Sequence, residues 1–132
     1  MGEAEAGLEM SGDRVAIFVT TLYEGLGFEG IDCVDFTKAV ESGIAELPTY
    51  AVINQDRAKD CFFVYLGFDR ISDEVRVVSA VLGFHEGTTD ADYFLQHYTG
   101  HFVSGEFRDD ANGLVTALDQ EIVRRLAQGW LE

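Results

Sequence analysis

Basic residues are scarce in this chain of 132 residues, which holds 9 Lys and Arg against 24 Asp and Glu and has a formal net charge of −15. Sequence-independent binding to nucleic acid requires basic side chains that neutralise phosphates, so the composition argues against that class of partner. Residues 1–66 carry a charge of −8 and residues 67–132 carry −7. The acidity therefore belongs to the whole surface and not to a tail. Only two of the nine bases are lysines, a bias that salt adaptation would also produce, so charge alone does not specify a function.

Proline and cysteine are also rare, with one proline and two cysteines. A single proline, 47% hydrophobic residues and 16 aromatic side chains exclude a disordered acidic chain. The longest apolar run, residues 61–68, is too short to span a bilayer. Cys33 and Cys61 stand in apolar surroundings, which favours buried free thiols over a disulfide. The acidic N-terminal sequence lacks the features of a secretory signal, and we expect a cytoplasmic protein.

The length fits one domain, which we place at residues 11–132, with residues 1–10 as a flexible extension. Apolar residues at helical spacing predict a first helix at residues 13–25. A second helix is predicted from Phe36 to Leu47, capped by Asp35. Three runs rich in β-branched and aromatic residues follow, at 50–54, 61–69 and 75–85, and they predict a three-stranded antiparallel meander.

The last third of the sequence predicts a short helix, a hairpin and a final helix. The short helix covers about residues 90–98. The hairpin joins strands 102–108 and 114–118 through Asn112-Gly113, a frequent hairpin turn. The final helix runs from Asp119 to Trp130. The expected fold is a single α+β domain in the order α-α-β-β-β-α-β-β-α, with an antiparallel sheet and the helices on one face.

This element order resembles the type III secretion chaperone-like fold and the related YbjN-like bacterial family. The local match is Phe94-Leu95 on the expected short helix, the run from His101 to Phe107, and the acidic glycine turn 109–113 that leads into Leu114-Val115. It covers about residues 50–118. The resemblance implies a homodimeric protein that acts on a partner polypeptide.

One sheet face is expected to stay uncovered if the helices pack on the other. Phe63, Tyr65, Val77 and Val81 would then form an apolar surface that marks an interface. Leu126 and Trp130, near the end of the chain, are expected to join it. Acidic side chains would line its rim and select a basic or amphipathic segment, and the candidates are Glu86, Asp90, Asp92, Glu106, Asp109 and Asp110.

The primary hypothesis is therefore a non-enzymatic binding protein, a chaperone or adaptor for another polypeptide, that needs no cofactor and binds no membrane. A second hypothesis is an immunity or inhibitor protein whose carboxylates neutralise a basic, nuclease-like partner. These two hypotheses differ in salt sensitivity, since apolar recognition persists at high salt and charge recognition does not.

A third hypothesis is a small-ligand or metal-dependent enzyme with a histidine-lined pocket. His97 and His101 are four residues apart, so on one continuous helix they would face the same way and could hold a metal. Gly100 lies between them and favours the alternative that the helix ends there. Residues 108–119 also have the register of a calcium loop, but Arg108 occupies the position of the first carboxylate, and a hairpin turn is the better interpretation.

Overall fold

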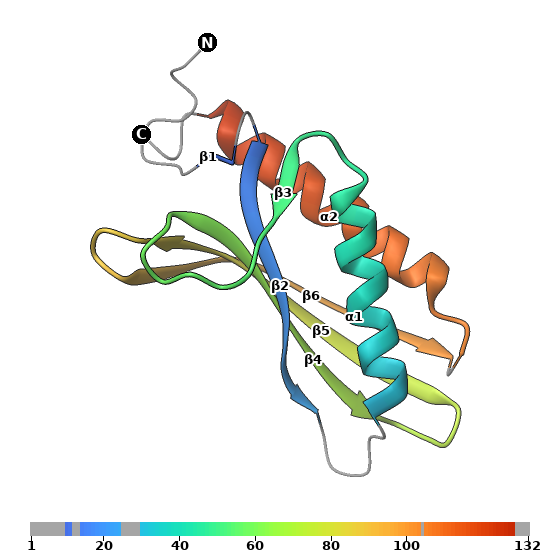
Figure 1. Ribbon diagram of the computed structural model, residues 1–132. Helices are drawn as coiled ribbons and strands as arrows, with labels where there is room; N and C mark the ends of the chain where they lie inside the picture. The colour runs from blue at the N-terminus through green and yellow to red at the C-terminus, as the bar shows by residue number, and fades with distance from the viewer. Residues whose placement is uncertain (1–9, 12–13, 25–29, 104, 129–132) are drawn as a thin grey trace.

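The computed structural model describes residues 10–11, 14–24, 30–103 and 105–128 of the chain (Figure 1). They form one sheet and two helices, which confirms the α+β class. In chain order the elements are β1 (Met10–Ser11), β2 (Arg14–Glu24), α1 (Gly30–Ala45), β3 (Tyr50–Val52), β4 (Cys61–Arg70), β5 (Val75–Glu86), β6 (Ala91–Val103) and α2 (Arg108–Ala127).

The sheet is mixed, with the strand order β1-β2-β4-β5-β6 and with β3 attached to β2. Strand β2 runs parallel to β3 and β4 because α1 carries the chain back to the same end of the sheet. Strands β4, β5 and β6 form an antiparallel meander. The expected all-antiparallel sheet, with strand 50–54 beside strand 61–69, is therefore wrong: Tyr50 of β3 pairs with Val15 of β2.

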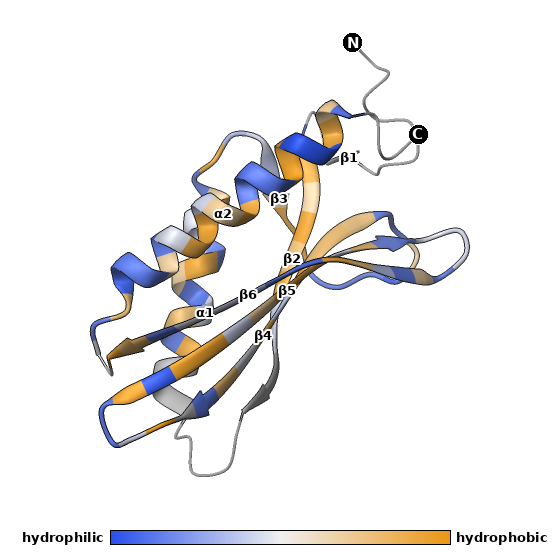
Figure 2. Ribbon diagram, turned by 180° about the vertical axis from the view of Figure 1, so that it is seen from behind, coloured by the Kyte–Doolittle hydropathy of each residue, from blue (hydrophilic) through white to orange (hydrophobic). Residues whose placement is uncertain are grey.

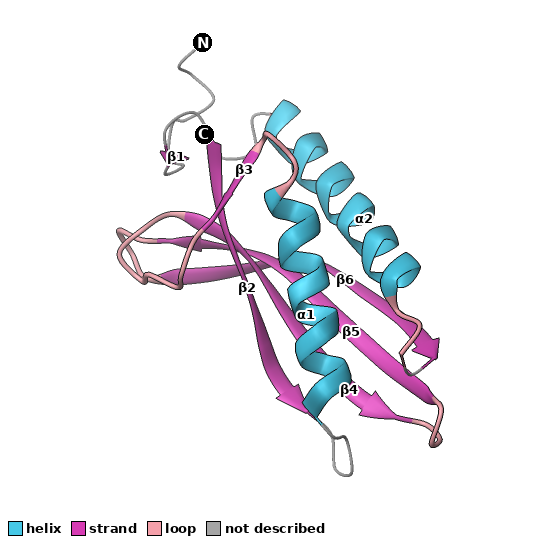
Figure 3. Ribbon diagram, turned by 45° about the vertical axis from the view of Figure 1, so that its right-hand side comes forward, coloured by secondary structure: helices cyan, strands magenta, loops and turns pink. Residues whose placement is uncertain are grey.

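Both helices lie on the same face of the sheet, as predicted (Figures 1 and 3). Helix α1 contacts β2 and α2 contacts β6, and the two helices cross where Gly43 meets Val115. The main core fills the space between this helical layer and the sheet, and Phe36, Phe62 and Phe102 are among its fully buried side chains. Figure 2 shows hydrophobic residues along the middle of the sheet and alternating with hydrophilic ones on α2.

The first predicted helix, at 13–25, is wrong, because residues 14–24 form strand β2. Val15, Ile17 and Val19 face the helices, whereas Ala16 and Phe18 face the opposite side, and all five are buried. A strand covered on both faces gives a continuous apolar run, which periodicity alone does not distinguish from a buried helix.

The predicted helix at 90–98 is also wrong, because these residues belong to strand β6. A bulge explains the misleading spacing. Gln96 pairs with Leu82 and Phe94 pairs with Gly83, so Leu95 has no partner on β5. The extra residue shifts the alternation of side chains, so that Leu95, Tyr98 and Phe102 all pack on the helical side.

The predicted hairpin at Asn112-Gly113 is replaced by helix α2, which absorbs the expected final helix as well. Ala111, Val115, Leu118 and Ile122 are its buried residues, and their helical spacing continues through the exposed Gly113. The same result removes the calcium-loop interpretation. The chaperone-like resemblance thus depends on an element order that differs from the one observed.

The remaining element predictions are confirmed with small changes. The second predicted helix is α1, which begins at Gly30, so Asp35 lies inside it and is not its cap. Strands 61–69 and 75–85 correspond closely to β4 and β5. Of the expected extension at 1–10, Met10 pairs with Val15 in β1, and residues 1–9 lie outside the described residues.

Candidate functional site: the helix-free face and the outer strand

The sheet face opposite the helices carries an apolar strip. Side chains alternate between the two faces along β5, and Val77 and Val81 point to this side, where both are partly exposed. Val81 pairs with Tyr65 of β4, and Phe63 belongs to the separate core cluster on this side. The structure thus brings together four residues predicted to form a partner surface. We call this surface the helix-free face and define it by Tyr65, Val75, Val77, Val81 and Phe94. Phe63 is on the same side but is fully buried beneath its neighbours, so its expected exposure on this surface is wrong.

The two residues expected to extend this surface from the end of the chain do not do so in the described structure. Leu126 lies on α2 and packs against the main core on the helical side, so its assignment to the helix-free face is wrong. Trp130 lies outside the described residues.

An aromatic cluster occupies one end of the helix-free face. The ring of Phe63 is fully buried, with ring centroids 4.5 Å from Tyr65, 6.1 Å from Phe18 and 5.9 Å from Phe94, which it meets edge-on. It lies over Gly83, where a Cβ atom would be 2.1 Å from the ring. Phe94 completes the cluster and is 68% exposed. The cluster therefore extends from a packed interior to solvent.

The segment 53–60 is tied to the β5–β6 hairpin by a buried histidine. His85 is 2% exposed; its Nδ1 lies 2.6 Å from Asp92 Oδ1 and its Nε2 lies 2.7 Å from the carbonyl oxygen of Arg57. Burial by itself lowers the pKa of His85, but the hydrogen bonds to Arg57 and Asp92 raise it above its ordinary value. Since both ring nitrogens face acceptors, the geometry fits the imidazolium, which donates from both.

The six acidic residues predicted to form a rim fall into two groups. Glu86, Asp90 and Asp92 lie at the β5–β6 hairpin, where Arg57 pairs with Asp90 at 2.8 Å and with Asp92 at 3.4 Å, and Glu86 accepts from Thr89. The second group, Glu106, Asp109 and Asp110, lies between β6 and the first turn of α2 and is exposed. The structure therefore does not form one continuous rim from the six.

The two histidines of the metal hypothesis do not converge. His97 and His101 lie on strand β6, where they pair with Val81 and Val77. Four residues along a strand span about 13 Å, too far for one metal ion. Among the described residues, no cluster of three or more His, Cys, Asp or Glu has a geometry able to hold a metal. The helical spacing argument fails because the segment is not a helix.

Cys61 is a buried free thiol at the start of β4, as predicted. Burial, followed by the charges of Asp60, Asp56 and Asp92, raises its pKa to about 11. A thiol with this pKa is almost entirely protonated at neutral pH and is a poor nucleophile. Cys33 lies in α1, and its side chain is outside the described residues.

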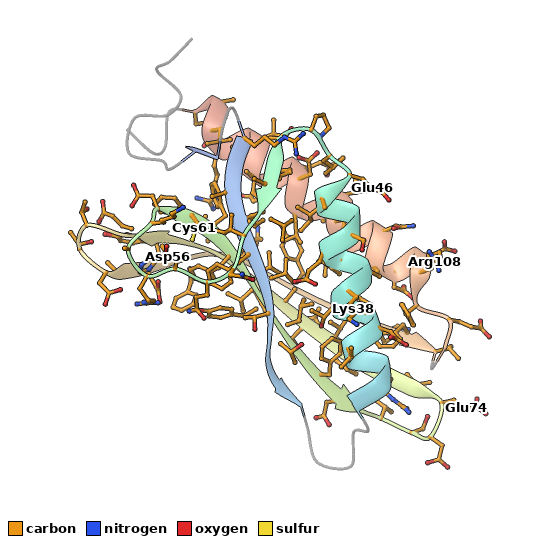
Figure 4. The ribbon with its side chains drawn as sticks, in the orientation of Figure 1. Lys38, Glu46, Asp56, Cys61, Glu74 and Arg108 are labelled. Atoms are coloured by element: carbon orange, nitrogen blue, oxygen red, sulfur yellow. The ribbon has the colours of Figure 1, made fainter. Side chains whose placement is uncertain are left out.

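Two hollows lie on the helical side. A cavity of about 210 Å³ separates α2 from β6 and is lined mainly by small and apolar residues, Gly100, Gly113, Leu114 and Ala117 among them. A wider hollow of about 540 Å³ lies between α1 and the start of α2. Lys38, Glu46 and Arg108 line it (Figure 4) together with Asp35. Its two cations are matched by two carboxylates, so it favours no charged ligand.

Comparison with known proteins gives a fold and no family. No protein-family model matches the chain, and no curated protein sequence matches it. Among solved structures, the dodecamer of a PelC variant from Paraburkholderia phytofirmans has a TM-score of 0.51 at 8% identity and covers 88% of this chain and 93% of its own. This likeness supports the fold alone.

Two weaker structural likenesses carry no argument about function. A protein described as a homologue of the neuraminyllactose-binding hemagglutinin from Helicobacter pylori has a TM-score of 0.45 at 13% identity, covering 92% of this chain and 87% of its own. The hypothetical protein CT253 from Chlamydia trachomatis has a TM-score of 0.45 at 10% identity, covering 89% of this chain and 98% of its own.

Within the described residues, neither helix combines the length and apolarity needed to cross a membrane.

Sequence reasoning missed Phe94, Gly83 and Gly100 as parts of these surfaces. The helical spacing of residues 90–98 places Phe94 on a helix. The roles of Gly83, which lies under the ring of Phe63, and of Gly100, which has open space beside it, follow only from the strand register. The available signal was the count of apolar residues in 91–103, which fits a strand with one inserted residue as well as a helix.

Proposed function

We propose that this chain is a non-enzymatic binding protein, of the chaperone or adaptor type, that holds a segment of another polypeptide on the helix-free face. The observation that carries the proposal is the partly exposed strip of Val75, Val77 and Val81, which Ser79 interrupts and which the exposed ring of Phe94 extends toward the hairpin. Contiguous apolar surface on a sheet face is typical of interaction sites.

The partner segment is amphipathic and basic. Its apolar side chains cover the valine strip, and its basic residues match a chain with a net charge of −15. A second copy of this chain, the homodimer expected from the sequence, carries the same −15 and is opposed by charge. The cytoplasmic location stays a prediction.

A photo-crosslinking amino acid at Val77 tests this proposal in a lysate of the source organism. The matched control is the same amino acid at Val123, a 47% exposed valine on α2 outside the helix-free face. We expect a crosslinked partner at position 77 that persists in 1 M salt and is missing at position 123. Equal adducts at both positions, adducts to a second copy only, or no adduct would overturn the proposal.

The inhibitor hypothesis has one specific observation in its favour, the exposed acidic group Glu106, Asp109 and Asp110. In that case the adduct at Val77 would be lost in 1 M salt, since ion pairs between exposed groups are screened beyond about 3 Å at that ionic strength. Loss of the adduct in salt would therefore replace the apolar mechanism with the electrostatic one.

A further inference from the structure

Strand β6 forms one edge of the sheet and is 13 residues long. Its outward backbone groups can be identified from three contacts. The carbonyl of Val75 accepts from Ile71, on the β4 side, so its partner Val103 turns its own backbone groups outward. The Val103 carbonyl indeed accepts from the Glu106 N–H at 2.8 Å, beyond the edge. Alternation then turns the backbone groups of 97, 99 and 101 outward as well.

Contacts occupy three of the outward backbone groups in the second part of this strand. The carbonyl of Leu95 at the bulge accepts from Arg125 at 3.1 Å. The N–H of His97 donates to the side chain of Gln96 at 3.1 Å. Between the occupied N–H of His97 and the occupied carbonyl of Val103, the outward backbone groups of Thr99 and His101 have no hydrogen-bond partner among the described residues; we call this stretch the window. Unpaired N–H and C=O groups on an edge strand can pair with the strand of another chain.

The 210 Å³ cavity lies directly beside this window. Residues 98–101 form its β6 wall, and Asp110, Gly113, Leu114 and Ala117 form its α2 wall. A Cβ atom built on Gly100 or Gly113 meets nothing within 4 Å. An engineered, enclosed cavity of about 150 Å³ binds benzene, so this more open space is large enough for one aliphatic or aromatic side chain.

We propose that β6 receives an added β-strand at Thr99–His101 and that the cavity receives one side chain of that strand. Main-chain hydrogen bonds would supply affinity, and the pocket would supply specificity, as in other grooves between an edge strand and a helix. Side chains alternate along an added strand, so the residue opposite Gly100 points to the helical side and into the cavity. This inference rests on the proposed function, polypeptide binding, and assigns a second contact to it.

The occupant is an extended, basic segment of another protein with a leucine-like or phenylalanine-like anchor. Glu106, Asp109 and Asp110 are exposed at this end of the edge, and Arg108 is the single base among residues 106–110. A second copy of β6 has no free side chain for the cavity. Its helical-side residues are already used, since Tyr98 donates to Ala117 and Phe102 stacks on Phe36 at 4.9 Å.

A peptide-binding experiment tests the inference. The probe is a blocked, fluorescein-labelled nine-residue peptide of alternating lysine and threonine with leucine at its centre, compared with a central-alanine peptide and with one in which glutamate replaces lysine. We expect the leucine peptide to bind at least ten-fold more tightly than either comparison peptide. We also expect it to protect the amide protons of Thr99 and His101 from hydrogen exchange.

Two variants block the site in different ways. Gly100→Leu fills the cavity from a position with open space, and Thr99→Pro removes an outward N–H without removing a bond to β5. Each should weaken binding of the leucine peptide at least ten-fold while the thermal unfolding curve stays cooperative; Val123→Ser is the control and should leave binding unchanged. If Thr99→Pro does not fold, the effect of Gly100→Leu on binding of the leucine peptide decides whether the site is correctly placed.

Binding that is insensitive to Gly100→Leu, absence of binding, or binding without protection at Thr99 and His101 would overturn the inference. None of these results removes the proposed function, because the cavity lies on the helical side of the sheet, whereas the crosslink at Val77 reports contact with the helix-free face and is measured separately. Conversely, loss of the crosslink at Val77 while the peptide still protects Thr99 would overturn the proposed use of the helix-free face and leave the inference about β6 standing.

Discussion

His85 links the tip of the β5–β6 hairpin to segment 53–60, and its charge is held from several directions. Asp92 of β6 and the Arg57 carbonyl bond to its two ring nitrogens, and Asp90 Oδ1 lies 3.5 Å from Nε2. Asp90 has a positive φ of 56°, a conformation that aspartate tolerates better than most residues. The Arg57 guanidinium opposes the imidazolium, and it pairs with the same two aspartates.

The stability of the protein should fall as the pH rises through the folded pKa of His85. That pKa is raised above 6.5 in the folded state. Protonation therefore stabilises the fold fully below about pH 6.5, and this contribution is lost above the folded pKa. Hydrogen bonds to charged groups contribute about 1.5–3 kcal/mol, so His85→Gln should cost about 2 kcal/mol at pH 5.5 and distinctly less at pH 9. Urea unfolding of both proteins at the two pH values measures this; an equal cost at both would contradict it.

Gly83 is required by the ring of Phe63. A Cβ at this position would lie 2.1 Å from the ring, and the ring is fully buried among aromatic neighbours. Gly83→Ala should therefore destabilise the fold by roughly 3 kcal/mol through overpacking. In a double-mutant cycle, Phe63→Leu should relieve part of that cost, because the smaller side chain leaves room for the methyl group. Additive losses in urea unfolding would show that the two residues do not compete for space.

At the scale of elements, the reliable sequence signals were the alternating ones. Strand β5 was predicted with the correct faces, because Val77 and Val81 alternate with buried residues. The sequence wrongly predicts helices in place of β2 and β6. Strand β2 is buried on both faces, and strand β6 contains a bulge at Leu95. Both features depend on what packs beside the strand, which the local sequence does not contain.

The candidate site divides in the same way. Alternation within two strands is a local property, so the sequence alone places Phe63, Tyr65, Val77 and Val81 on one sheet face. The window at Thr99 and the cavity beside Gly100 could not, because they require the register of β6 against β5 and the position of α2. A helix in place of the predicted hairpin creates one wall of that cavity.

Helix α2 contains a glycine that its fold does not need. Gly113 lies in the helix, is exposed and has open space at its Cβ position. Gly113→Ala should stabilise the protein by about 0.5–1 kcal/mol, because alanine loses less backbone entropy in a helix. The matched control is Gly105→Ala, also in open space but with a φ of +80°; it should destabilise by about 1 kcal/mol. Urea midpoints measure both changes, and the same sign for the two would contradict this account.

At the scale of the whole molecule, the acidity is distributed over both layers. The described ion pairs use Arg57 at the hairpin and Arg124 and Arg125 on α2, where both arginines pair with Glu121. With 24 acids and 9 bases in the chain, carboxylates outnumber basic side chains by 15. Repulsion among them opposes the compact state.

Salt should therefore stabilise this protein. Raising the ionic strength from about 0.01 M to 1 M shortens the screening length from about 30 Å to about 3 Å, which weakens repulsion between the distributed carboxylates more than it weakens the few close ion pairs. We expect Tm in KCl to rise by several degrees over this range, since about 1 kcal/mol corresponds to roughly 4 °C in a domain of this size. The control is the double variant Asp109→Asn, Asp110→Asn, which removes two charges and should show a smaller rise. A Tm that does not change in molar KCl would mean that charge repulsion does not destabilise the folded state. Salt adaptation would then no longer explain the scarcity of lysine.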